Sequence, residues 1–200
     1  MRLIERRGVL VAVLGGGHER IGALSVPFSD RPTIMMSAAK GKRDRSRLDV
    51  SHELGHLVMH SPADRATKEV ENPAQAFAAE LLMPGDEIVD ELPRTLDLDR
   101  LVALKRRWQV SIAALLYRAR ALDVMADATY TQAMKMMSAR GWRRHEPADL
   151  GLPESPVLLR TAVETAGLSE QELADQLAIP LPLLRDVLST AADHRPEIVI

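Results

Sequence analysis

Short apolar runs at the start of the chain predict a small β-sheet. A run rich in β-branched residues occupies positions 8–14, further short runs occupy 21–25 and 33–36, and glycine or proline separates them. Apolar runs of this length favour buried strands. The glycines at 15–17 lack the spacing of a phosphate-binding loop, so we expect only a turn there. Because the three strands lie so close together along the chain, we predict an antiparallel sheet.

From about residue 46 onward, the apolar positions recur with the period of an α-helix. The first predicted helix begins at Ser46, because Ser-x-x-Asp is a favourable N-cap sequence, and it ends near His60, before Pro62. Further helices are predicted at 74–83, 98–108, 111–122 (with Ser111 as the N-cap), 130–139, 157–166, 170–177 and 181–188. The predicted fold class is therefore α+β and mostly helical, with a small three-stranded sheet.

A passage rich in proline and glycine divides the chain into two parts. The residues that interrupt the helical pattern there are Pro147, Gly151, Pro153 and Pro156. We therefore predict one domain over residues 1–150 and a helical C-terminal appendage over residues 151–200.

The last two predicted helices have the spacing of a helix-turn-helix. A second helix that reads DNA needs cations and amides that reach phosphates and base edges. The second helix here offers only Arg185, which is followed by Asp186. We therefore expect the appendage to pack on the domain or to bind a partner, and we expect no direct binding of nucleic acid.

Composition excludes several classes of protein and site. The chain has 200 residues, a formal net charge of −2 and no cysteine, which excludes a disulfide framework and a cysteine-type zinc cluster. This charge gives no general attraction to nucleic acid or to a membrane surface, and the basic run at 40–47 is expected to be a solvated loop. The N-terminus is charged where a signal peptide would be apolar, and no run is long enough to span a bilayer. A cytoplasmic protein is expected.

The first predicted helix carries the candidate chemistry. His52 and His56 are four positions apart, so a helix places both imidazoles on one face, where they can reach the same metal ion. Glu53 follows the first histidine and lies beside such an ion, where it can take a proton from water. On this helix an apolar face is predicted from Val50, Leu54, Leu57 and Val58, and a polar face from Asp49, His52, Glu53, His56 and His60.

Two histidines leave a catalytic zinc ion one protein ligand short. The candidates for the third ligand are His60, Glu69, Glu71 and Glu80. A helix rises about 12 Å between His52 and His60, so one ion cannot contact both, and His60 is better explained as a partner behind the ligands. Glu71 lies fifteen positions after His56, which leaves enough chain for a facing helix to return it to the site.

Two segments together resemble a known family, the ImmA/IrrE metallopeptidases. The first is 47–60, with the histidine motif, and the second is 71–84, with the pattern Glu-x-x-Ala-x-x-Phe-Ala. Segments at 108–111, 115–119 and 138–143, with Glu146-Pro147, resemble members in which the peptidase domain follows an N-terminal helix-turn-helix. The resemblance covers residues 8–150 and implies a zincin-like fold, in which the active-site helix packs on the sheet.

The resemblance implies a role for each residue of the motif. His52, His56 and Glu71 are implied to bind Zn²⁺, and Glu53 is implied to be the general base. Asn72-Pro73 departs from this pattern, because it predicts an N-cap and first helical residue that leave Glu71 just outside its helix. Glu69 is the alternative ligand, and Glu80 is expected on the outer face of the helix. The candidates for an oxyanion donor, which sequence alone does not separate, are His18, Arg47, Tyr117 and Tyr130.

The function implied by the resemblance is that of a zinc-dependent endopeptidase acting in transcription regulation and stress response. Its expected substrate is a helix-turn-helix repressor or an antitoxin, whose cleavage relieves repression. We expect that repressor to be a separate chain, unless a fused N-terminal domain has been removed. The alternative is a non-proteolytic regulatory domain that senses a metal or a small ligand. Histidine and carboxylate ligands suit zinc, but they also suit manganese and iron.

Overall fold

A three-stranded sheet forms the base of the structure. The computed structural model describes residues 1–14, 22–37, 41–61 and 68–189. Its strands are β1 (Leu10–Leu14), β2 (Ala23–Val26) and β3 (Thr33–Ser37), in the spatial order β1-β3-β2. β1 pairs with β3 in parallel, with Leu10 opposite Thr33, and β2 pairs with β3 antiparallel.

The prediction of an antiparallel sheet is therefore wrong for one of its two strand pairs. β1 and β2 follow each other along the chain but are not neighbours in the sheet, because β3 lies between them. β3 is the most buried strand, with four buried residues of five against three of five in β1 and none in β2. Placing it between two neighbours buries more apolar surface than leaving it at an edge. The spacing of apolar runs along the chain does not reveal this order. The predicted turn at 15–17 lies outside the described residues.

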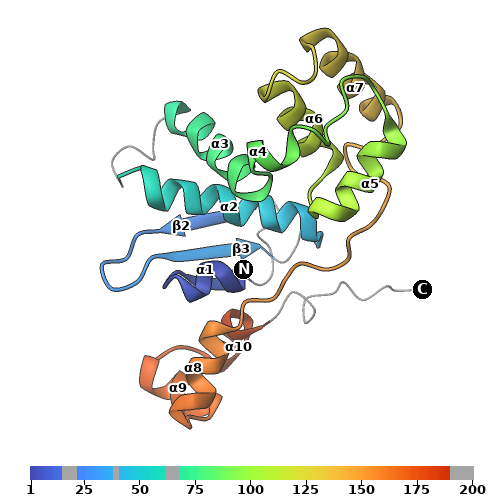
Figure 1. The fold of residues 1–200 in the computed structure, drawn as a ribbon. Coiled ribbons are helices and arrows are strands. Elements are labelled where there is room, and N and C mark those ends of the chain that lie inside the picture. The colour runs from blue at the N-terminus through green and yellow to red at the C-terminus, as the bar shows by residue number, and fades with distance from the viewer. Residues whose placement is uncertain (15–21, 38–40, 62–67, 190–200) are drawn as a thin grey trace, which may run out of the picture.

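Helix α2 (Arg43–Met59) covers one face of the sheet, and α1 (Arg2–Arg6) lies on the other side (Figure 1). Val50 of α2 is 2 % exposed and packs with the buried side chains of the sheet, and Leu54 and Leu57 join the edge of that cluster. The prediction that Val58 belongs to the apolar face is wrong, because Val58 is 65 % exposed. The apolar face of α2 is therefore narrower than the sequence pattern indicated.

α2 begins three residues before the predicted N-cap. Its N-cap is Lys42, and Ser46 instead donates its hydroxyl to the carbonyl of Arg43 at 3.0 Å. The backbone N–H of Arg43 donates to Gly151 O at 3.1 Å, so contacts with a distant segment hold the first turn. Most of the basic run at 40–47 is thus helical rather than a solvated loop, and residues 38–40 lie outside the described part.

A second helical layer lies above α2 (Figure 1). The short 3₁₀ turn η3 (Lys68–Val70) leads directly into α3 (Glu71–Leu82), and α4 (Gly85–Ile88) follows. α3 therefore begins at Glu71, and the prediction that Asn72-Pro73 starts the helix is wrong. Pro73 is in the first turn, where the backbone N–H that proline lacks has no partner within the helix.

Helices α5 (Leu98–Trp108), α6 (Ile112–Ala121) and α7 (Asp127–Ala139) form a second core beside α2 (Figure 1). Ser111 is the N-cap of α6, as predicted, and accepts the N–H of Ala114 at 3.1 Å. Lys105 of α5 is 3 % exposed and lies between two carboxylates, 2.9 Å from Asp44 and 2.8 Å from Glu146. Glu146 also accepts the N–H of Ile112 at 2.7 Å, so this cluster links α2, α5 and α6.

Three helices form the C-terminal part of the described chain: α8 (Leu158–Ala166), α9 (Glu170–Leu177) and α10 (Leu181–Leu188). They have a small core of their own, built around Ala174, Leu184 and Leu188, and α8 and α10 also pack against β1. Glu5 accepts the backbone N–H of Leu158 at 2.8 Å, at the start of α8. The division of the chain at residue 150 stays a prediction.

Candidate metal centre

The two histidines of α2 point their Nε2 atoms at the same place. His52 Nε2 lies 3.0 Å from His56 Nε2, and the two rings meet edge to face at 80°. A spacing of four residues is just over one helical turn, so this convergence follows from the helix itself. His56 is 6 % exposed and His52 is half-buried, so both rings are held in the protein and still reach its surface.

Glu71 completes a group of three donor atoms. Its carboxylate oxygens lie 3.2 Å from His52 Nε2 and 3.6 Å from His56 Nε2. Glu71 occupies the first position of α3, so its side chain projects from the end of that helix over the histidines. Donor atoms of His52, His56 and Glu71 all lie within 4.8 Å of one another and could hold a metal ion. Glu69, the alternative ligand, is exposed on η3 and is not part of this group.

The separations between these atoms suit a small tetrahedral metal ion. Nitrogen and oxygen ligands stand about 2.0–2.2 Å from zinc, which puts neighbouring ligand atoms roughly 3.3 Å apart in a tetrahedral site. The two Nε2 atoms are 3.0 Å apart, Glu71 Oε2 lies 3.2 Å from His52 Nε2, and Glu71 Oε1 lies 3.6 Å from His56 Nε2, all close to that value. Two imidazoles and one carboxylate are also a donor set found in catalytic zinc sites. The residues present therefore fit such an ion.

A close helix contact brings Glu71 to the histidines. A Cβ atom built on Gly55 would lie only 3.2 Å from the Cα and the carbonyl oxygen of Ala74, and 3.2 Å from a ring carbon of Phe77. Gly55 therefore allows α3 to lie directly on α2. Gly55 was not among the residues predicted from the sequence. Its signal was a glycine inside a helix, which costs about 1 kcal/mol relative to alanine and indicates close backbone approach.

His60 lies behind His56 rather than at the donor group. Its Nδ1 atom is 3.1 Å from His56 Nδ1, on the opposite side of the His56 ring from Nε2. His60 is half-buried and is outside the group of three donors, as the distance argument expected. His60 therefore fixes the orientation of the His56 ring. The other histidine ligand, His52, has a buried Nδ1 atom without a hydrogen-bond partner in the described residues.

The surroundings of His56 keep its ring neutral. Burial is the largest effect and lowers its pKa, and the charge of His52 lowers it further. Glu53 and Glu71 act in the opposite direction but do not cancel the shift. A neutral imidazole has a lone pair for a metal, so the site is prepared for ligation at neutral pH.

The remaining candidates from the sequence lie elsewhere. Glu80 is on the outer face of α3, as predicted, with its side chain 61 % exposed and paired with Arg118. The backbone N–H of Gly85 and the Arg118 side chain lower the pKa of Glu80. Tyr130 packs on the core of α5–α7, with Arg120 over its ring at 5.0 Å.

The other oxyanion candidates are Arg47, Tyr117 and His18. Arg47 points away from the three-donor group and pairs with Glu154 at 3.5 Å. Tyr117 is half-buried on α6. His18 lies outside the described residues.

The fold and the donor group together define a zincin-like protein, in which a helix on a small sheet supplies two histidines and the next helix supplies a glutamate. Residues 4–120 match the model of the peptidase M78 family, described as an IrrE N-terminal-like domain, and the chain therefore belongs to that family. No curated protein matches the chain. No helix in the described residues has the length and apolar character needed to cross a membrane.

Proposed function

We propose that this protein is a zinc-dependent endopeptidase of the cytoplasm that cleaves a helix-turn-helix repressor or an antitoxin and thereby relieves repression. The observation that carries the proposal is the grouping of donor atoms from His52, His56 and Glu71 within 4.8 Å of one another. Membership of a metallopeptidase family supports the hydrolytic activity. The resemblance to the ImmA/IrrE proteins supports the class of substrate and the role in transcription.

The chain supplies the metal ligands and the general base that peptide hydrolysis at a zinc site needs. His52, His56 and Glu71 would hold the ion, and His60 would keep the His56 ring in its orientation. Bound zinc supplies Lewis acidity, which polarises a carbonyl group and lowers the pKa of water to about 7. Glu53 is half-buried beside the histidines, where its carboxylate can accept a proton from water and return it to the departing amine.

Substitution of Glu53 by Gln separates peptidase activity from metal binding. The purified full chain, with zinc and metal content measured by elemental analysis, is incubated with each repressor encoded by a neighbouring gene. We expect wild type to cleave one of them and Glu53→Gln to bind the same amount of zinc without cleaving it. Glu69→Gln is the matched control, because Glu69 is an exposed carboxylate outside the donor group, and it should cleave normally.

The same experiment decides between proteolysis and sensing. If wild type and Glu53→Gln both leave every candidate repressor intact but change its binding to DNA, the protein is a non-proteolytic regulatory domain. If zinc is absent from purified protein and does not bind when added, the proposed cofactor is wrong. Manganese and iron are tested in the same assay, because both accept histidine and carboxylate ligands.

A further inference from the structure

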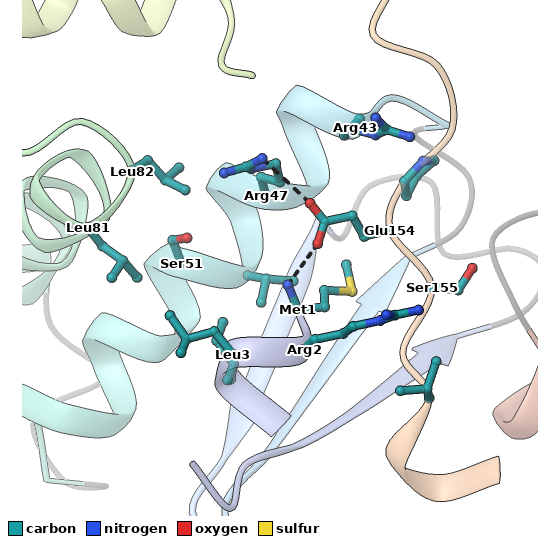
Figure 2. Close-up of a pocket in the computed structure, with 14 residues that line it drawn as sticks. Met1, Arg2, Leu3, Arg43, Arg47, Ser51, Leu81, Leu82, Glu154 and Ser155 are labelled. Atoms are coloured by element: carbon teal, nitrogen blue, oxygen red, sulfur yellow. Dashed lines mark hydrogen bonds and ion pairs between the residues drawn. The ribbon is translucent and has the colours of Figure 1, made fainter. Parts of the chain in front are cut away.

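A cavity of about 720 Å³ lies on the side of α2 that faces away from the metal centre. Figure 2 shows its walls, which come from α1, the first half of α2, the end of α3 and the extended segment 153–157. Its residues on α2 include Arg47, Val50 and Ser51. On a helix these residues project in a different direction from His52 and His56, so the cavity and the metal centre are separate sites.

Apolar side chains surround the mouth of this cavity. Leu3, Leu81 and Val157 are 62 %, 40 % and 39 % exposed, and all three line it. They come from three segments that are far apart in the sequence. Large apolar side chains that gather around a hollow, rather than lying singly on a surface, are typical of a binding site. The cavity also has the size of small-molecule sites, which hold about 300–1,000 Å³.

The polar groups of the cavity carry an excess of positive charge. Arg2, Arg43, Arg47 and the Met1 amino group line it, and Glu154 is the one carboxylate among its lining residues. Glu154 lies 2.9 Å from the Met1 amino group and 3.5 Å from Arg47. Arg43 donates instead to a neutral acceptor, the carbonyl of Leu152, at 3.1 Å. The single carboxylate of Glu154 does not neutralise the positive charge of the lining residues, so guanidinium groups are available to an anionic ligand.

Ser51 adds a polar atom that faces the cavity. The residue is 3 % exposed and lines the cavity, and in Figure 2 its side chain lies beside Leu81 and Leu82 at the end of α3. No hydrogen bond to its hydroxyl is formed within the described residues. A serine in a helix can satisfy its hydroxyl with the carbonyl one turn earlier, and Ser46 bonds in that manner to Arg43. The free hydroxyl of Ser51 is available to a ligand.

We propose that this cavity binds a small amphipathic anion, an aliphatic chain with a terminal carboxylate. Leu3, Leu81 and Leu82 would contact the chain, and Arg47 would bind the carboxylate with its planar, two-pronged guanidinium group. The ligand would touch the residue next to His52 and the far end of the helix that begins with Glu71. It therefore contacts both helices that carry the metal centre, although the proposal does not depend on peptidase activity.

Calorimetric titration of the full chain with sodium decanoate, below its micelle concentration, tests the proposal. We expect saturable binding of one decanoate per chain, and at least about tenfold weaker binding of decylammonium, which has the same chain and the opposite charge. Absence of saturable binding, or equal binding of the two compounds, would overturn the proposal. This comparison uses wild type alone, so it does not depend on how any variant folds.

Three variants locate the bound carboxylate. Arg47→Gln should weaken decanoate binding about tenfold, because it removes the proposed partner of the carboxylate. Arg45→Gln is the matched control, since its side chain is 56 % exposed, pairs with Asp49 and does not line the cavity. Glu154→Gln should strengthen binding, because it removes the anion that competes for Arg47. Equal effects of Arg45→Gln and Arg47→Gln, or weaker binding in Glu154→Gln, would contradict the assignment.

Discussion

The Nδ1 atoms of His56 and His60 lie 3.1 Å apart, so one imidazole donates a hydrogen and the other accepts it. When His56 uses Nε2 as a ligand, its proton is on Nδ1, and His60 is the acceptor. Hydrogen bonds of this kind set the tautomer and the orientation of a ligand ring. The prediction is that His60→Leu lowers zinc affinity by about 10–100-fold and leaves the stoichiometry unchanged. Competition with a chelating dye measures this, with His145→Leu as the exposed control.

Glu71 and Glu69 are two neighbouring carboxylates with different expected roles. Glu71→Gln removes an anionic donor 3.2 Å from His52, and it should lower zinc affinity by at least about tenfold. Glu69→Gln changes an exposed side chain on η3 and should leave affinity within about twofold of wild type. Both are measured in the dye competition. If Glu69→Gln lowers zinc affinity and Glu71→Gln does not, Glu69 is the ligand and the assignment of Glu71 is wrong.

Gly55 controls the distance between α2 and α3. In Gly55→Ala the new methyl group meets backbone atoms of Ala74 at 3.2 Å, and backbone cannot move aside as a side chain can. We expect α3 to shift by a few tenths of an ångström and zinc affinity to fall, although alanine has the higher helix propensity by about 1 kcal/mol. Thermal unfolding of the metal-free protein is measured in parallel. Unchanged affinity in a folded variant would show that the close contact does not position Glu71.

Lys105 is a buried cation between two carboxylates. Burial works to lower its pKa, but the hydrogen bonds that Lys105 donates to Asp44 and Glu146 outweigh burial and raise it, so the ammonium stays charged. Lys105→Met leaves both carboxylates without their partner and should cost about 3–5 kcal/mol of unfolding free energy. Urea unfolding at pH 7 measures the loss. The control is Lys135→Met, at an exposed position of α7, for which we expect a change within about 0.5 kcal/mol.

Glu154 gives a prediction with a defined pH dependence. Burial tends to raise the pKa of its carboxyl group, but the Met1 amino group, Arg47 and Arg43 together bring it below its ordinary value of 4.5. A carboxyl group with a lowered pKa stabilises the folded state above pH 4.5, and this contribution is lost as the pH falls through the folded-state value. Glu154→Gln should therefore cost roughly 0.5–1 kcal/mol at pH 7, because the ion pair is half-exposed.

Urea unfolding of wild type and Glu154→Gln at several pH values checks this dependence. The difference in unfolding free energy should be constant between pH 6 and 7 and should shrink below about pH 4.5. A difference that grows on acidification would mean that the carboxylate is not stabilised by the cations around it. Arg45→Gln, which alters another exposed pair on α2, should show no such trend.

The residues of the metal centre were predictable because their spacing is local. His52 and His56 are one turn apart on a helix, and any helical context brings them together. Glu71 was harder, because its neighbour Pro73 suggested a later helix start. The preceding 3₁₀ turn decides where α3 begins, and a turn of only three residues has no clear signal in the sequence. The resemblance of the longer segment, rather than the local pattern, indicated Glu71.

The features that sequence reasoning missed depend on distant segments. The start of α2 is held by the carbonyls of Gly151 and Leu152, more than a hundred positions away, so a local capping rule gave the wrong residue. The order of the strands is another such feature, since it depends on which strand gains most from burial. The exposure of Val58 has the same origin: helical periodicity shows which residues share a face, but not how far the sheet extends beneath it.

Glu146 lies beyond the segment that matches the family, which ends at residue 120. Its carboxylate nevertheless accepts the N–H groups of Ile112 and Ala113 at the start of α6 and binds Lys105. A gene trimmed to the family match would therefore encode a protein in which Lys105 has lost one counter-ion and the N–H groups of Ile112 and Ala113 have lost their acceptor. The segment that matches the family is therefore shorter than the segment needed to keep the buried charge of Lys105 balanced.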